Sequence, residues 1–174
     1  MGEARPEPAR VLVAGIGNVL RADDGFGPAV VQALEREGAL PAGARTVELG
    51  IGGIGLVHEL LGGYDALIVV DAVDRGGPPG ALYVLEPELP EPPSPPGRAV
   101  VTDMHEAVPA RALVIARALG ALPSFVRIVG CQPAETEELS LELSPVARRA
   151  LPGAIAAVRA LVEEAQAVPA CRPA

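Results

Sequence analysis

Three loops of the sequence carry the side chains best suited to chemistry. The first loop is rich in glycine and ends with the paired carboxylates Asp23 and Asp24, the second begins at Asp71, and the third contains His105. Carboxylate oxygens and a neutral imidazole are ligands that nickel or zinc accepts. One imidazole and two carboxylates would hold such a cation and leave coordination positions open for a partner or a water molecule.

Each of these residues also has a simpler structural interpretation. Adjacent aspartates favour a helix N-terminus, an aspartate after a buried strand often caps a turn, and His105 could be a solvated residue at the start of a helix. The local pattern leaves these alternatives open, because the intervals between Asp24, Asp71 and His105 are long. The other histidine, His58, falls in a short amphipathic segment and is expected to face solvent.

A nucleotide site is an alternative for the first loop. Gly15 and Gly17 follow a predicted strand, as in the dinucleotide fingerprint, but Leu20 stands where the third glycine is required. The carboxylates of Asp23 and Asp24 would also meet a pyrophosphate with like charge. We therefore prefer a cation site to a nucleotide site here.

Other catalytic patterns are weak. The sequence contains neither a G-x-S-x-G elbow nor an HExxH motif. Cys131 follows a predicted strand and could be a nucleophile beside His105, but a buried packing cysteine is the preferred interpretation. Asp74 and Arg75 could pair with each other, as surface ions often do. The sequence assigns no catalytic nucleophile.

The elements that position these loops alternate between strands and helices. Short apolar runs predict strands, and apolar residues at helical spacing, bounded by Ser144 or Gly38, predict helices. The predicted strands are 10–14, 46–49, 66–70, 81–85 and 125–129, and the predicted helices are 28–36, 56–61, 106–119 and 144–164, the last kinked or split at Pro152-Gly153. This order predicts a single α/β domain with a mostly parallel central sheet of about five strands and helices on both faces. Sites in such folds form beyond the carboxyl ends of the strands.

Composition and charge exclude several functional classes. The net charge is −8 and the isoelectric point is about 4.8, which argues against a nucleic-acid partner. The two cysteines, Cys131 and Cys171, are not spaced as a disulfide framework, so a cytoplasmic location is expected. No signal peptide or membrane-spanning run is expected. Residues 1–9 and 166–174 are predicted to be flexible tails of a domain that spans 10–165.

A series of motifs runs through the chain in a defined order. The opening motif is Gly15-Ile16-Gly17-Asn18 followed by Asp23-Asp24-Gly25-x-Gly27. The later motifs are Val47-Glu48 with Gly53-x-Gly55 and Leu60-Leu61, then Leu67-Ile68-Val69-Val70-Asp71-Ala72, Thr102-x-x-His105, Val129-Gly130-x-Gln132-Pro133, Leu139-Ser140 and Leu143-Ser144-x-Val146. In this order they resemble the hydrogenase maturation proteases, the endopeptidases that clip the C-terminal tail from the large subunit of nickel–iron hydrogenases. The resemblance covers about residues 10 to 165.

The resemblance implies an endopeptidase that removes the C-terminal extension of a nickel–iron hydrogenase large-subunit precursor after nickel insertion. In that family an acidic residue of the first loop, an aspartate at the end of the third strand and a histidine of a later loop bind nickel. These positions match Asp24, Asp71 and His105. The precursor would be the partner and would supply the nickel. Two departures, Gly50 for an acidic residue and Val108 for a small one, fall on the expected substrate-facing surface.

Two further questions stay open at the level of sequence. A non-catalytic nickel-binding or chaperone module could use the same three residues. The group that attacks the peptide bond could be a water activated by a carboxylate or a water polarised by the metal.

Overall fold

The structure, a computed structural model, describes residues 8–38, 40–51, 53–89 and 108–167. His105, Cys171 and most of both predicted tails lie outside these residues. Among the helices that are described, none is long and apolar enough to cross a lipid bilayer.

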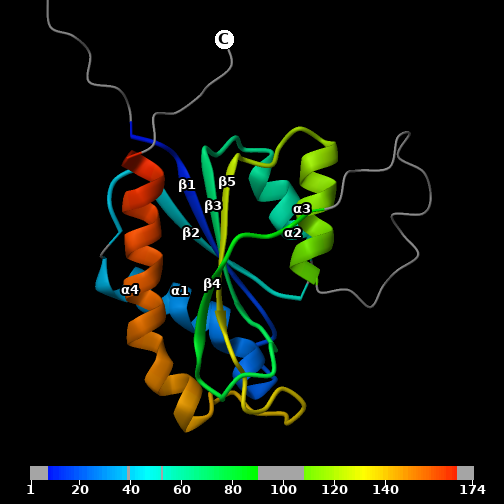
Figure 1. Ribbon diagram of the computed structural model, residues 1–174, viewed down its shortest axis with the longest axis vertical. Coiled ribbons are helices and arrows are strands. Elements are labelled where there is room, and N and C mark those ends of the chain that lie inside the picture. The colour runs from blue at the N-terminus through cyan, green and yellow to red at the C-terminus, as the bar shows by residue number, and fades with distance from the viewer. Residues whose placement is uncertain (1–7, 39, 52, 90–107, 168–174) are drawn as a thin grey trace, which may run out of the picture.

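A five-stranded sheet forms the centre of the domain (Figure 1). The strands are β1 (Val11–Ile16), β2 (Ala44–Leu49), β3 (Ala66–Ala72), β4 (Leu82–Leu85) and β5 (Phe125–Cys131). Their order is β2-β1-β3-β5-β4, with β4 antiparallel to β5 and all other neighbours parallel. The whole of β1 is buried, as expected for a strand covered on both faces. The predicted mostly parallel sheet is confirmed.

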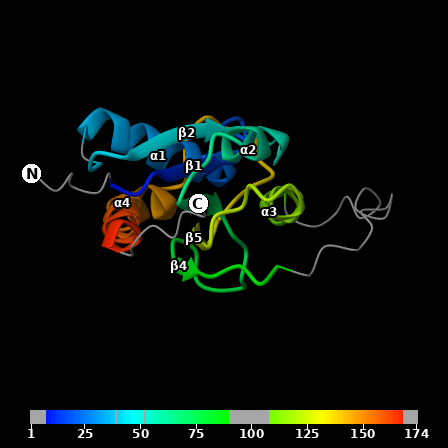
Figure 2. The same cartoon turned by 90° about the horizontal axis from the view of Figure 1, so that it is seen from above.

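Helices cover both faces of this sheet (Figures 1 and 2). One face carries α1 (Phe26–Glu37) and α4 (Pro145–Ala167), and the other carries α2 (Gly53–Leu60) and α3 (Val108–Ala118). Neighbouring residues of β3 serve different faces, since Ile68 packs in the cluster of Phe26 and Leu67 packs in the cluster of Leu56. The continuous apolar run of β3 therefore reflects two cores, one on each side.

Three strands continue further at their carboxyl ends than the sequence predicts. β1 ends at Ile16, β3 at Ala72 and β5 at Cys131. The ladder between β3 and β5 includes the pair Asp71 and Gly130, so Asp71 lies within the strand and not in the loop after it. Backbone pairing thus fixes the position of this carboxylate on the sheet.

Helix α4 is a single helix of 23 residues although it contains Pro152. The prediction that the helix splits there is wrong. An interior proline removes one hydrogen bond and costs about 3 kcal/mol. The apolar face of α4, which includes Ala154, Val158 and Val162, is fully buried in the core and holds the helix together across this site.

The predicted helix ends at Ser144 and Gly38 are confirmed. Ala147 donates its N–H to Ser144 Oγ over 3.2 Å, as an N-cap requires, and α4 begins at Pro145. Gly38 follows α1 with a φ of 60°, the left-handed conformation that glycine adopts without strain. Gly38 thus ends α1, and the next element along the chain is β2, one of the two edge strands.

Candidate functional site

The glycines of the first loop let its backbone fold tightly against its surroundings. Gly17 has a φ of 137°, and a Cβ at this position would clash with the carbonyl oxygen of Asp24. A Cβ on Gly27 would clash with the carbonyl oxygen of Val70 in β3. Because glycine removes both obstacles, the short 3-10 helix η1 (Ala22–Gly25) and the start of α1 approach the carboxyl ends of β1 and β3.

Asp24 lies on η1 and is half-buried. Its Oδ2 accepts a hydrogen bond from the backbone N–H of Asn18 over 3.0 Å. The side-chain oxygen of Asn18 in turn accepts the N–H of Leu20 over 3.0 Å. These two bonds close the loop onto itself and restrict the orientation of the Asp24 carboxylate.

Asp71 lies near the end of β3 and is also half-buried. Its Oδ1 accepts the N–H of Ala72 over 2.8 Å, which favours the ionised form. Burial outweighs this bond and, together with a smaller contribution from the negative charge of Asp24, raises the pKa of Asp71 from 3.8 to about 7. The two carboxylates therefore interact across the rim of the sheet, and near neutral pH Asp71 is partly protonated.

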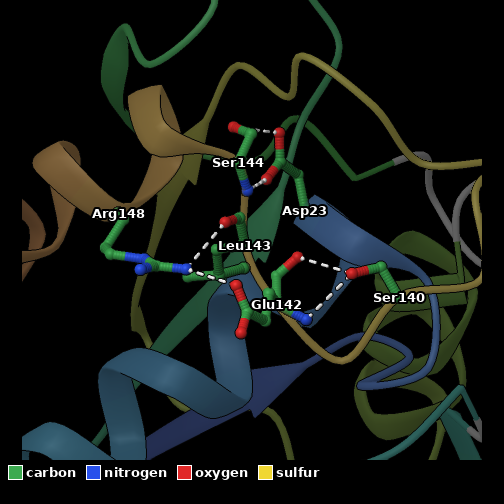
Figure 3. A network of polar contacts seen from close by, with 6 residues as sticks. All are labelled: Asp23, Ser140, Glu142, Leu143, Ser144 and Arg148. Atoms are coloured by element: carbon green, nitrogen blue, oxygen red, sulfur yellow. Dashed lines mark hydrogen bonds and ion pairs between the residues drawn. The ribbon is translucent and has the colours of Figure 1, made fainter.

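Asp23, the neighbour of Asp24, has a different role. Only 1% of its surface is exposed. Its carboxylate accepts four hydrogen bonds, from the N–H groups of Ala134 (2.8 Å), Glu135 (3.3 Å) and Ser144 (2.7 Å) and from Ser144 Oγ (2.9 Å). Figure 3 shows its two contacts with Ser144 at the start of α4. Asp23 is thus a structural tie between the first loop and the segment that follows β5.

Gln132, part of the motif Val129-Gly130-x-Gln132-Pro133, orders the loop that follows β3. Its side chain is buried, and its Oε1 accepts the N–H groups of Arg75 (2.8 Å) and Gly77 (3.2 Å). Its Nε2 donates to Asp74 Oδ1 over 2.9 Å and lowers the pKa of Asp74. The motif places Gln132 directly after β5 but does not predict these hydrogen bonds.

The expected pair between Asp74 and Arg75 is wrong. Asp74 binds Gln132 and accepts the N–H of Gly76 over 2.9 Å instead. The guanidinium of Arg75 lies over the ring of Tyr83 at 6.0 Å. Gln132 binds the side chain of Asp74 but only the backbone of Arg75, so the two neighbouring side chains have different partners, which a local pattern does not reveal.

The exposure of Cys131 and His58 decides between the interpretations that the sequence allows for them. Cys131 is buried, and this burial raises the pKa of its thiol to about 11, so the packing interpretation is confirmed. His58 is exposed on α2, as predicted. Within the described residues no group of three or more His, Cys, Asp or Glu side chains could hold a metal ion. Of the predicted ligands, Asp24 and Asp71 lie close enough for the charge of Asp24 to raise the pKa of Asp71, and His105 lies outside the described residues.

Comparison with known proteins points to one family. A family model described as hydrogenase maturation protease matches residues 28–161. The hydrogenase expression/formation protein HupD of Rhodobacter capsulatus is 39% identical over 156 residues, which covers 89% of this chain and 72% of HupD. The hydrogenase expression/formation protein HoxM of Cupriavidus necator is 33% identical, covering 83% of this chain and 70% of HoxM.

Solved structures agree with these sequence matches. The hydrogenase maturating endopeptidase HybD from E. coli has a TM-score of 0.72 and 28% identity, covering 89% of this chain and 93% of HybD. A hydrogenase 2 maturation peptidase from a Thaumarchaeota archaeon has a TM-score of 0.61 and 34% identity, covering 86% and 95% of the two chains.

Proposed function

The chain belongs to the hydrogenase maturation protease family and is an endopeptidase that processes the C-terminal end of a hydrogenase large subunit, and we propose that it cuts only a precursor whose nickel it has recognised. In this proposal Asp24, Asp71 and His105 contact the nickel that the precursor carries. The reaction takes place in the cytoplasm, before the large subunit is complete.

The observation that carries the proposal is the repulsion between the carboxylates of Asp24 and Asp71 at the rim of the sheet, which helps to raise the pKa of Asp71. Two carboxylates that repel each other in a half-buried position are costly to keep ionised. A divalent cation between them would replace this repulsion with attraction and displace the proton from Asp71. Oxygen donors together with one imidazole form a ligand set that nickel accepts.

Nickel recognition of this kind would act as an affinity gate. A precursor without nickel would lose the contacts that the metal makes with the protease. About 3 kcal/mol of such contact would separate loaded from empty precursor by roughly a hundredfold in affinity. The gate would thus delay the cut until metal insertion is complete.

Two activations of the attacking water fit these residues. A carboxylate could take the proton from the water as it attacks the peptide carbonyl. The substrate's nickel could instead polarise the water. Asp71, with its pKa of about 7, can hold or release a proton near neutral pH and suits the first of these routes.

Incubation with nickel-loaded and nickel-free precursor tests the proposal. We expect loss of the precursor tail only with the loaded form, and loss of this cleavage in Asp24→Asn, Asp71→Asn and His105→Ala. Asp74→Asn is the matched control, because Asp74 is an exposed aspartate close to Asp71 in sequence that binds Gln132. Equal cleavage of both precursors would refute the nickel gate and leave the protease assignment intact. A stable complex without cleavage would favour the chaperone alternative.

A nucleotide site has less support than a metal site in the first loop. The N–H of Asn18, which a bound phosphate would need, already donates to the carboxylate of Asp24. We expect nickel or cadmium to raise the melting temperature and nucleotides to leave it unchanged. Stabilisation by a nucleotide that survives Asp24→Ala would contradict this expectation.

A further inference from the structure

An exposed apolar lip stands beside the candidate metal-binding loop. The lip is formed by residues 137–142, between β5 and α4. Within it, Leu139 is 81% exposed and Leu141 is 78% exposed. These two leucines lie two residues apart and next to the loop that carries Asp24. Large apolar side chains that are exposed together beside a candidate site are typical of a surface that binds a partner.

The lip is paired with the loop that carries Asp24. Ser140 donates its N–H to the carbonyl oxygen of Leu20 over 3.0 Å, and Ala22 donates to the carbonyl oxygen of Ser140 over 2.9 Å. This parallel bridge between Arg21 and Ser140 places Leu20 opposite Leu139. Leu20 is 55% exposed, so it extends the apolar surface of the lip toward the first loop.

A network of polar contacts holds the lip in place (Figure 3). Ser140 Oγ accepts the N–H of Glu142 over 3.0 Å and donates to its carbonyl oxygen over 3.2 Å. Arg148 on α4 binds the carboxylate of Glu142 and the carbonyl oxygen of Leu143. Just beyond the lip, Ser144 is bound by the buried carboxylate of Asp23. Leucines on a segment fixed in this way lose little conformational freedom when they bind a partner.

The lip itself carries three carboxylates and no basic side chain. Glu137, Glu138 and Glu142 are all exposed. Arg21 lies 3.9 Å from Glu137, and Arg148 neutralises Glu142, whereas Glu138 has no ion-pair partner in the part of the chain that the structure describes. With a net charge of −8, the chain would repel a second copy of this surface and attract a basic one.

We propose that the lip, together with Leu20, is the docking surface for an apolar segment of the precursor that is flanked by basic residues. This role rests on the proposed function, because a precursor segment that reaches Asp24 comes within reach of Leu20 in the same loop. Leu139 and Leu141 provide the apolar contact, and Glu138 favours the basic flank. The lip therefore sets which protein is held, whereas the carboxylates of the rim respond to its metal.

Cleavage kinetics of the double variant Leu139→Ser/Leu141→Ser test the docking role. We expect KM for nickel-loaded precursor to rise at least about tenfold, or about 1.4 kcal/mol, with kcat unchanged. The matched control is Leu61→Ser/Leu119→Ser, two leucines that are 59% and 58% exposed and follow the ends of α2 and α3. This control should leave KM unchanged, and circular dichroism should show that both variants are folded.

A single-charge variant tests the contribution of Glu138 to docking, and a binding experiment tests whether the lip binds the precursor or a second copy of the chain. Glu138→Gln should raise KM and reduce its dependence on salt, because one charge is removed from the surface that steers the precursor. Precursor binding measured by calorimetry distinguishes the proposal of docking at the lip from the proposed proteolysis. Binding without cleavage that the double variant abolishes would refute proteolysis and support docking, whereas normal cleavage with unchanged KM would refute docking alone. A wild-type dimer that the double variant dissociates would also refute it, by assigning the lip to self-association.

Discussion

Asp71→Asn should stabilise the protein at neutral pH. Burial and the charge of Asp24 raise the pKa of Asp71 from 3.8 to about 7 in the folded state. At a pH between these two pKa values, Asp71 keeps its proton in the folded state and releases it in the unfolded state. The free energy of unfolding therefore falls as pH rises through this range. One pKa unit is worth about 1.4 kcal/mol, so the ionised Asp71 costs about 4 kcal/mol above pH 7. An asparagine has no charge to bury and avoids this cost.

Urea denaturation of wild type and variant between pH 4 and pH 8 checks the magnitude. The difference in the free energy of unfolding should be close to zero near pH 4 and should grow to about 4 kcal/mol at pH 8. For a chain of this size the gain corresponds to roughly 10 °C in melting temperature. The stabilised variant should at the same time lose cleavage of the precursor, as expected where a functional site is kept at the expense of stability.

Asp74→Asn is the control for this experiment. The side chain of Gln132 and the N–H of Gly76 lower the pKa of Asp74, so its ionised form is favoured in the folded state. The contribution of Asp74 is therefore present above its ordinary pKa and is lost as pH falls, which is the opposite sign. A gain for Asp71→Asn that is equal at pH 4 and pH 8, or a similar gain for Asp74→Asn at pH 8, would refute the electrostatic explanation.

Three other predictions concern the frame around the site. Asp23→Ala should lower the free energy of unfolding by about 3 kcal/mol in urea denaturation, because four donors lose the buried carboxylate that accepts their hydrogen bonds. A loss below about 1 kcal/mol would show that water replaces the carboxylate. Gly17→Ala should lower the free energy of unfolding and abolish cleavage, since the φ of 137° at Gly17 and the nearby carbonyl oxygen of Asp24 exclude a Cβ. Gly50→Ala, where a Cβ would face open space, should leave the free energy of unfolding unchanged. In a Cys171→Ser background, the Cys131 thiol should react with a thiol reagent only in urea, because it is buried and its pKa is about 11; rapid labelling of the native protein would contradict this.

Much of the fold follows from local pattern. Apolar runs and helical spacing predict the alternation of strands and helices, and Ser144 and Gly38 mark helix ends that the structure confirms. A strand that is apolar at every position, such as β3, requires cover on both faces, so the layers follow as well. The rim that gathers the first loop and Asp71 is likewise a consequence of parallel strands, whose carboxyl ends share one edge.

Local pattern does not distinguish two adjacent aspartates. Asp23 and Asp24 are alike in sequence, but the first is buried against Ser144, 121 residues away, and the second lies near Asp71. The sequence likewise did not reveal the bonds that Gln132 makes to the backbone of Arg75 and Gly77. These roles depend on contacts between residues that are distant in the chain and become neighbours only when the sheet and helices pack.

The sequence by itself therefore determined the order of the elements, the edge where the site lies and the family to which the chain is similar. The tertiary structure decided which carboxylate is structural, where Asp71 sits within β3 and whether α4 continues through Pro152. The physical reason is that propensity and periodicity act between near neighbours, whereas burial and long-range hydrogen bonds act between segments. Where the two compete, as at Pro152, the packing of a whole helix face exceeds the cost of one lost hydrogen bond.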